Sequence, residues 1–168
     1  MTRFGYALLS LVVLATDLFT KWLVLKNFAI HESKTVIPGL FQLVHVRNPG
    51  AAFGIGANSD SALVPLLLNG GAIAVFFIVV AYSLRTAVTE RVLQLGLHLI
   101  LAGAIGNLID RFRLGSVVDF LDFYVSSGGR EHHWPAFNVA DSAICIGVGL
   151  LFLDMWRKPE PSATPVRS

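Results

Sequence analysis

Residues 106–123 read GNLIDRFRLGSVVDFLDF, and the chain changes character within them. An uncharged apolar run ends at Ile109, and charged residues then crowd into the next thirteen positions: Asp110, Arg111, Arg113, Asp119 and Asp122. Asp119 lies between apolar neighbours, and such surroundings raise the pKa of a carboxyl group unless a donor or a cation compensates. Because carboxyl groups prepared in this way serve as catalytic acids and bases, this stretch is a candidate active site.

A second stretch, WPAFNVADSAI at residues 134–144, carries a matching group. Asn138 and Asp141 are three positions apart and would share one face of a helix. Asp141 lies about one turn inside a membrane-length apolar segment, which makes it a functional candidate. Two carboxylates from different segments could share one proton, so that one acts as a base on water and the other as an acid, as in aspartic proteases.

The composition favours a membrane protein of one domain. Hydrophobic residues make up 54% of the 168 residues and charged residues only 14%, where a soluble domain has about a quarter. The net charge of +2 and the absence of a basic run argue against a nucleic-acid partner. The single cysteine, Cys145, rules out an internal disulfide and is expected to be a small packed residue. His132 and His133 lack metal-site spacing, so we expect no metal and no cofactor.

Four apolar segments predict transmembrane helices, at about residues 4–25, 62–84, 92–109 and 137–156. In the first, Asp17 and Lys21 are spaced to pair on one face, and we expect that polar pair to be structural. In the third, glycines at positions 96, 103 and 106 form a small-residue face for helix packing, and Asn107 and Arg111 share a face. In the second, the run Asn69-Gly70-Gly71 also predicts close packing against a neighbour.

A small β-sheet at the membrane surface is predicted for about residues 34–54. Two short apolar runs, at 35–37 and 40–46, flank the turn residues Pro38-Gly39. Residues 125–133 resemble a polar loop. The fold class is therefore an all-α polytopic membrane protein with four transmembrane helices and a small β-sheet at the membrane surface. Residues 1–157 form a single membrane domain, and the proline-containing residues 158–168 are expected to be a disordered tail.

Four spans place both termini on one side of the membrane. Counting Lys and Arg beside the spans gives six on either side, so the positive-inside rule does not choose the orientation.

Taken together, these motifs resemble those of bacterial lipoprotein signal peptidases, also called signal peptidase II. The resemblance covers nearly the whole chain, and its motifs appear in order at the expected places relative to the spans. They are the paired Asp17 and Lys21, NPGAAF at 48–53, GNLIDR at 106–111, VVDF at 117–120 and FNVADS at 137–142. The Asp-Thr-Gly and Asp-Ser-Gly signatures of soluble aspartic proteases are absent.

The resemblance implies an aspartic endopeptidase of the bacterial inner membrane with both termini in the cytoplasm and its active site near the extracytoplasmic face. Such an enzyme removes the signal peptide from diacylglyceryl-modified prolipoproteins, cleaving just before the lipidated cysteine. By motif, Asp119 and Asp141 are the catalytic dyad. The implied substrate-binding residues are Asn48, Gly50, Asn107, Arg111 and Asn138. We expect a monomer whose partners are prolipoproteins and membrane lipids.

The residues alone leave two alternatives. A small four-span transporter or proton relay could use the same two carboxylates, because intramembrane acids serve relays as well as catalysis. The second alternative is a structural membrane subunit, but that role would not explain why the acidic residues cluster. The residues alone also do not separate Asp119 from Asp110 and Asp122; only the motif selects it.

Overall fold

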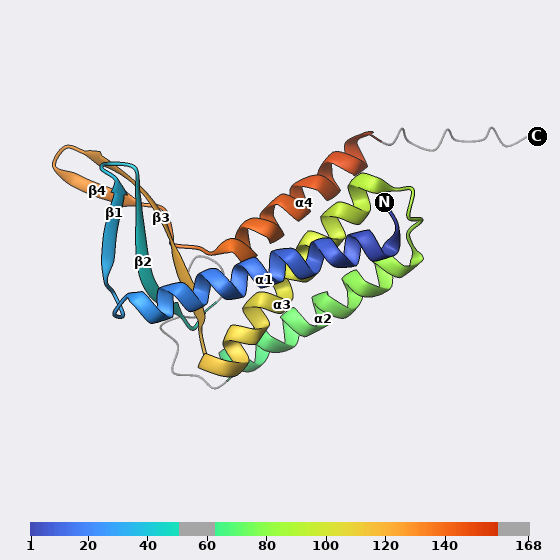
Figure 1. Cartoon of the computed structure of the whole chain (residues 1–168), viewed down its shortest axis with the longest axis horizontal. Helices are drawn as coiled ribbons and strands as arrows, with labels where there is room; N and C mark the ends of the chain where they lie inside the picture. The colour runs from blue at the N-terminus through green and yellow to red at the C-terminus, as the bar shows by residue number, and fades with distance from the viewer. Residues whose placement is uncertain (51–62, 158–168) are drawn as a thin grey trace, which may run out of the picture.

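The computed structural model describes residues 1–50 and 63–157, which form a bundle of helices with a sheet at one end (Figure 1). The helices are α1 (Arg3–Asn27), α2 (Leu63–Arg85), α3 (Arg91–Leu114) and α4 (Val139–Arg157). Each is long and apolar enough to cross a membrane, which confirms the four predicted spans. Helix α3 continues past the expected end at Ile109, so Asp110 and Arg111 are helical residues.

Helix α3 is the centre of the bundle and packs against each of the other three helices. Its glycine face is confirmed, because a side chain at Gly96 would meet the backbone oxygen of Gly147 at 2.8 Å, and one at Gly103 would meet the backbone of Ala140. Only glycine allows the backbones of α3 and α4 to approach this closely. The same prediction for Gly70 in α2 is wrong for the described part of the chain, in which nothing lies within 4 Å of a side chain placed there.

The ends of the helices follow from local chemistry. Thr2 caps α1, because its hydroxyl oxygen accepts the Gly5 N–H at 3.2 Å. Gly115 ends α3 in the left-handed conformation with φ of 70°, and its N–H donates to the carbonyl of Arg111. Glycine is favoured there because it has no Cβ to oppose that conformation. The β-branched residues Val117 and Val118 follow at once and begin a strand.

The sheet has four antiparallel strands in the order β1-β2-β3-β4: β1 (Ser33–Ile37), β2 (Phe41–Asn48), β3 (Val117–Ser127) and β4 (Arg130–His133). The first two confirm the predicted strands, although residues 51–54 of the predicted β region lie outside the described residues. The polar loop predicted at 125–133 is wrong. That segment closes a hairpin between β3 and β4, in which Gly128 and Gly129 supply the positive φ angles of a tight turn.

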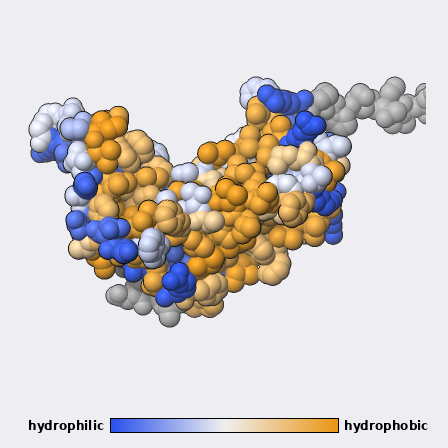
Figure 2. Space-filling model, viewed as in Figure 1, coloured by the Kyte–Doolittle hydropathy of each residue, from blue (hydrophilic) through white to orange (hydrophobic). Residues whose placement is uncertain are grey.

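Both described ends of the chain lie at one end of the bundle, opposite the sheet (Figure 1). Val24 of α1 packs against Val118 and Phe120 of β3 and so joins the sheet to the helices. Apolar side chains cover the helices, and hydrophilic ones gather toward the two ends (Figure 2). This distribution is what a membrane-spanning bundle requires, because lipid surrounds its middle and water its ends. The predicted tail, 158–168, lies outside the described residues.

Candidate active site

Asn138 and Asp141 form a reciprocal cap at the start of α4. The side-chain oxygen of Asn138 accepts the Asp141 N–H at 2.9 Å, and Asp141 Oδ2 accepts the Asn138 N–H at 3.2 Å. This is the geometry of a capping box, with aspartate at the third helical position. Asn138 therefore precedes the helix, so the prediction that it shares a helical face with Asp141 is wrong, although the side chain of each residue accepts the backbone N–H of the other.

The same Asn138 side chain also binds Asp119. Its Nδ2 donates to Asp119 Oδ1 at 2.7 Å, and Asn48 Nδ2 donates to Asp119 Oδ2 at 3.1 Å. Asp119 lies in β3 opposite Val46 of β2, two residues before Asn48, so the strand pairing brings Asn48 to the carboxylate. Both oxygens of this carboxylate are thus held while its side chain is almost wholly buried, at 2% exposure.

Asn107 of α3 completes the connection between the segments. Its Nδ2 donates to Asp141 Oδ1 at 2.8 Å, and its side-chain oxygen accepts from Asn138 Nδ2 at 3.3 Å. The two carboxylates therefore come from a strand and a helix, and asparagine side chains from three further places hold them. The structure brings together Asp119, Asp141 and the three predicted asparagines.

Arg111 lies one helical turn after Asn107, as predicted from their spacing. Its Nη2 donates to the carbonyl of Gly50 at 3.1 Å, and its guanidinium interacts electrostatically with Asp141 and Asp119. Asn48 Oδ1 accepts the Gly50 N–H at 3.0 Å. Gly50, the fifth predicted binding residue, is thus fixed beside the dyad through its backbone.

The electrostatics of Asp119 suit an acid that works near neutral pH. Burial, with the charge of Asp141 second, raises the pKa of Asp119 from 3.8 to about 7. Hydrogen bonds from Asn48 and Asn138 and the charge of Lys21 act in the opposite direction, and burial prevails. A carboxyl group with this pKa is about half protonated in neutral solution, so it can donate its proton there.

A groove of about 640 Å³ opens onto the two carboxylates. Asn48, Asn107, Arg111, Asp119 and Asp141 line its polar part. Its apolar part is lined by Leu68, Ala72 and Val75 of α2, Ile100 and Ala104 of α3, and Ile144 of α4. The site therefore combines a paired acid with an apolar channel between helices, which suits a substrate that is part peptide and part hydrocarbon.

Cys145 also lines this groove and is exposed, so the prediction that it is a packed residue is wrong. It lies one turn after Asp141 and shares its helical face. Hydropathy of the neighbouring residues gave no sign of this, because the walls of the groove are themselves apolar.

The acids that the sequence left ambiguous are separated by their partners. Asp110 pairs with Lys21 at 3.1 Å, and Lys21 also makes the predicted pair with Asp17 at 2.8 Å. Asp122 belongs to the sheet, where its Oδ2 accepts from Gln42 Nε2 at 2.6 Å and lies 2.8 Å from His133 Nδ1.

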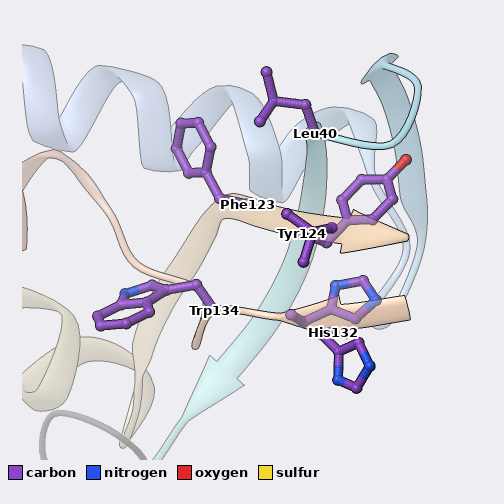
Figure 3. Close-up of a pocket in the computed structure, with 7 residues that line it drawn as sticks. Leu40, Phe123, Tyr124, His132 and Trp134 are labelled. Atoms are coloured by element: carbon purple, nitrogen blue, oxygen red, sulfur yellow. The ribbon is translucent and has the colours of Figure 1, made fainter. Parts of the chain in front are cut away.

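A second hollow, of about 350 Å³, lies against β3, β4 and the turn before β2 (Figure 3). It is lined mainly by aromatic and aliphatic side chains, including Leu40, Phe123 and Tyr124, with His132 and His133 beside them. Trp134 borders both this hollow and the larger groove. His133 stacks on Tyr124 with ring centroids 5.1 Å apart, so it serves the packing of this surface.

The chain is similar to known proteins over almost its entire length. A family model described as Signal peptidase (SPase) II matches residues 9–157. The lipoprotein signal peptidase of Syntrophotalea carbinolica is 48% identical over 151 residues, which are 89% of each chain. That of Desulforapulum autotrophicum is 51% identical over 142 residues, covering 84% of this chain and 85% of the relative.

Solved structures agree with this assignment. One described as a bacterial membrane enzyme superposes with a TM-score of 0.79 at 31% identity and covers 96% of both chains. A second with the same description gives a TM-score of 0.81 at 27% identity. From the matched family model, the identities and the fold, the chain belongs to the signal peptidase II family, whose members are peptidases.

Proposed function

We propose that this protein is a membrane aspartic endopeptidase that removes the signal peptide from diacylglyceryl-modified prolipoproteins, cleaving just before the lipidated cysteine. The observation that carries the proposal is that one residue, Asn138, binds both carboxylates: its side chain donates to Asp119 Oδ1, and its backbone N–H donates to Asp141 Oδ2. Two acids held together in this way cannot both ionise easily, so they share a proton.

The shared proton assigns the roles. Asp119 carries the shared proton in the active form because its pKa is raised to about 7, and Asp141, at the positive end of the α4 dipole, is the base. Asp141 takes a proton from water as the water oxygen bonds to the scissile carbonyl carbon, and Asp119 gives its proton to the carbonyl oxygen. The resulting diol collapses as the C–N bond breaks. Asp141 then returns a proton to the leaving nitrogen, and a diol hydroxyl re-protonates Asp119.

The rest of the groove suits the lipidated substrate. Arg111 and the asparagines offer donors for the peptide backbone beside the dyad, and the apolar walls from α2, α3 and α4 accept hydrocarbon or signal-peptide side chains. Asp119 lies in β3 and Asp141 in the first turn of α4, so the dyad lies where the sheet meets the bundle, at the end opposite both described ends of the chain. We therefore orient the protein in the inner membrane with cytoplasmic termini, an extracytoplasmic sheet and an extracytoplasmic active site. One chain carries both carboxylates, so a monomer is sufficient for the proposed reaction.

The proton-relay alternative is weaker. A relay or transporter needs a path across the membrane, whereas the dyad and its asparagines are hydrogen-bonded in one cluster at the start of α4. Membership of a peptidase family also favours hydrolysis over transport.

Cleavage of a purified lipidated prolipoprotein in detergent tests the proposal. The parent should release the signal peptide, with the lipidated cysteine as the new N-terminus by mass spectrometry. Asp119→Asn and Asp141→Asn should each remove activity while leaving the protein folded. Asp122→Asn is the matched control, because it changes a buried acid of the same strand that lies outside the groove, and it should cleave like the parent. Normal turnover by either dyad variant would refute the assignment.

A further inference from the structure

Three charged side chains lie buried behind the dyad, outside the groove. Asp17, Lys21 and Asp110 are 0%, 1% and 2% exposed, and Lys21 Nζ lies 2.8 Å from Asp17 Oδ2 and 3.1 Å from Asp110 Oδ2. We call these three residues the triad. Burying charges costs free energy, and this cost is recovered only when each charge has well-placed partners. The remaining contacts of the triad therefore indicate what it does.

Each acid of the triad holds the backbone immediately before one member of the dyad. Asp17 Oδ1 accepts the N–H of Ala140, the residue before Asp141, at 2.9 Å. Asp110 Oδ2 accepts the N–H of Val118, the residue before Asp119, at 3.1 Å. These two acceptors come from α1 and α3, whereas the donors belong to α4 and β3. One buried unit thus ties together the two segments that carry the dyad.

Lys21 reaches the dyad by a third contact, through Asn107. Its ammonium donates to the Asn107 side-chain oxygen at 3.0 Å. Lysine can only donate, so it fixes which end of the amide faces it and turns the NH₂ group toward Asp141. That NH₂ group donates to Asp141 Oδ1 at 2.8 Å.

The residues around the triad are closely packed and buried. A side chain at Gly106 would collide with the Asp17 carboxylate, so glycine at this position of α3 is what lets Asp17 reach across to α4. The Val118 side chain is fully buried, as is Ala140, so neither backbone N–H has water as an alternative partner.

We infer that the Asp17–Lys21–Asp110 triad is the positioning unit of the active site, which sets the separation and orientation of the Asp119 and Asp141 carboxylates without contacting the substrate. The inference rests on the proposed function and extends it. A group of charges that only stabilised the bundle would not need to bind the backbone beside both carboxylates or to orient the Asn107 side chain. Misplacing reacting groups by about 1 Å lowers rates by about a hundredfold.

The test measures kcat and KM separately for Lys21→Met, which keeps the length of the side chain and removes the charge, and for Asp110→Asn, which keeps an oxygen for the Val118 N–H. Both use the folded, monodisperse protein in detergent with lipidated prolipoprotein as substrate. We expect kcat to fall by about a hundredfold for Lys21→Met and about tenfold for Asp110→Asn. KM should stay within about threefold in both, because the triad does not line the groove. Asp122→Asn is the control and should match the parent.

The pH profile supplies a reading that a purely structural role would not change. The charges that bear on Asp119 are Asp141 from α4, Lys21 from α1 and Arg111 from α3. Lys21 lowers the pKa of Asp119, so Lys21→Met should move the alkaline limb of kcat/KM to higher pH.

Parental kcat and an unmoved alkaline limb in folded Lys21→Met or Asp110→Asn would overturn the inference. Loss of folded protein in both variants, with a stable Asp122→Asn, would assign the triad to stability alone and overturn it as well. Failure of the parent itself to cleave would instead refute the proposed function, so the two failures are distinguishable.

Discussion

Replacing Asp119 with asparagine should abolish cleavage and yet make the protein more stable in neutral and alkaline solution. The pKa of Asp119 rises from 3.8 to about 7 on folding, mainly because its carboxyl group is buried. The folded state therefore holds the proton more tightly than the unfolded state does. That stabilisation is fully present below pH 3.8 and is lost as the pH rises through about 7.

The size of the effect follows from the two pKa values. Each unit of difference is worth about 1.4 kcal/mol, so ionising Asp119 costs the folded parent about 4 kcal/mol at pH 8 relative to pH 3. Asparagine never ionises and avoids this loss. Its NH₂ group must, however, face a donor from Asn48 or Asn138, which costs about 1–3 kcal/mol at every pH. The useful measurement is therefore how the difference in the free energy of unfolding between variant and parent changes with pH, and not its value at one pH.

The assay is thermal unfolding in detergent, followed by tryptophan fluorescence, for the parent and Asp119→Asn between pH 4 and 8.5. For a chain of this length, about 4 kcal/mol corresponds to an unfolding temperature higher by on the order of 10 °C. The unfolding temperature of the variant minus that of the parent should grow by this amount from pH 4 to pH 8.5. A difference that stays constant, or that shrinks as the pH rises, would refute the reasoning.

Three further outcomes are expected. Arg111→Lys loses the guanidinium donor that binds the Gly50 carbonyl, so kcat/KM should fall about tenfold to a hundredfold while membrane insertion is unchanged. Parental kinetics would leave Arg111 without a role at the site. Asn138→Ala removes the cap of α4, so it should lower the free energy of unfolding by about 1 kcal/mol and abolish cleavage. An active variant would contradict the proposal that Asn138 holds both carboxylates in place. In a background without the native cysteine, Ser127→Cys should react with an impermeant thiol reagent outside spheroplasts and Thr89→Cys should not, and the reverse pattern would invert the proposed orientation.

The helices could be predicted from the sequence because lipid imposes a strict rule on length and hydropathy. The hairpin of β3 and β4 was missed. Its second half, residues 125–133, is polar and exposed, so its composition resembles a loop. The signal that could have identified them was the pair Gly128-Gly129, since two adjacent residues with positive φ are what a two-residue hairpin turn requires.

That missed strand also explains why the residues alone did not distinguish Asp119 from Asp122. Asp119 and Asp122 are three positions apart in β3, so their side chains point to opposite faces of the sheet. Of the two, only Asp119 lines the groove. Asp110 poses a different difficulty. Its partners are a lysine on α1 and a backbone N–H of β3, which are contacts between segments that no local pattern encodes. The motif resemblance pointed to Asp119, Asp141 and the asparagines beside them, but it did not indicate that Asp17 and Asp110 bind the backbone next to the two carboxylates.

The central claim is that two carboxylates sharing one proton activate water, and the pH dependence of kcat/KM in the presence of a chelator tests it most directly. With purified parent and lipidated prolipoprotein, we expect a bell-shaped profile, because one acid must keep its proton while the other has lost it. The alkaline limb should fall near pH 7, where Asp119 loses its proton, and the chelator should change nothing. Activity that the chelator removes and zinc restores, or a rate that stays level up to pH 9, would contradict the account.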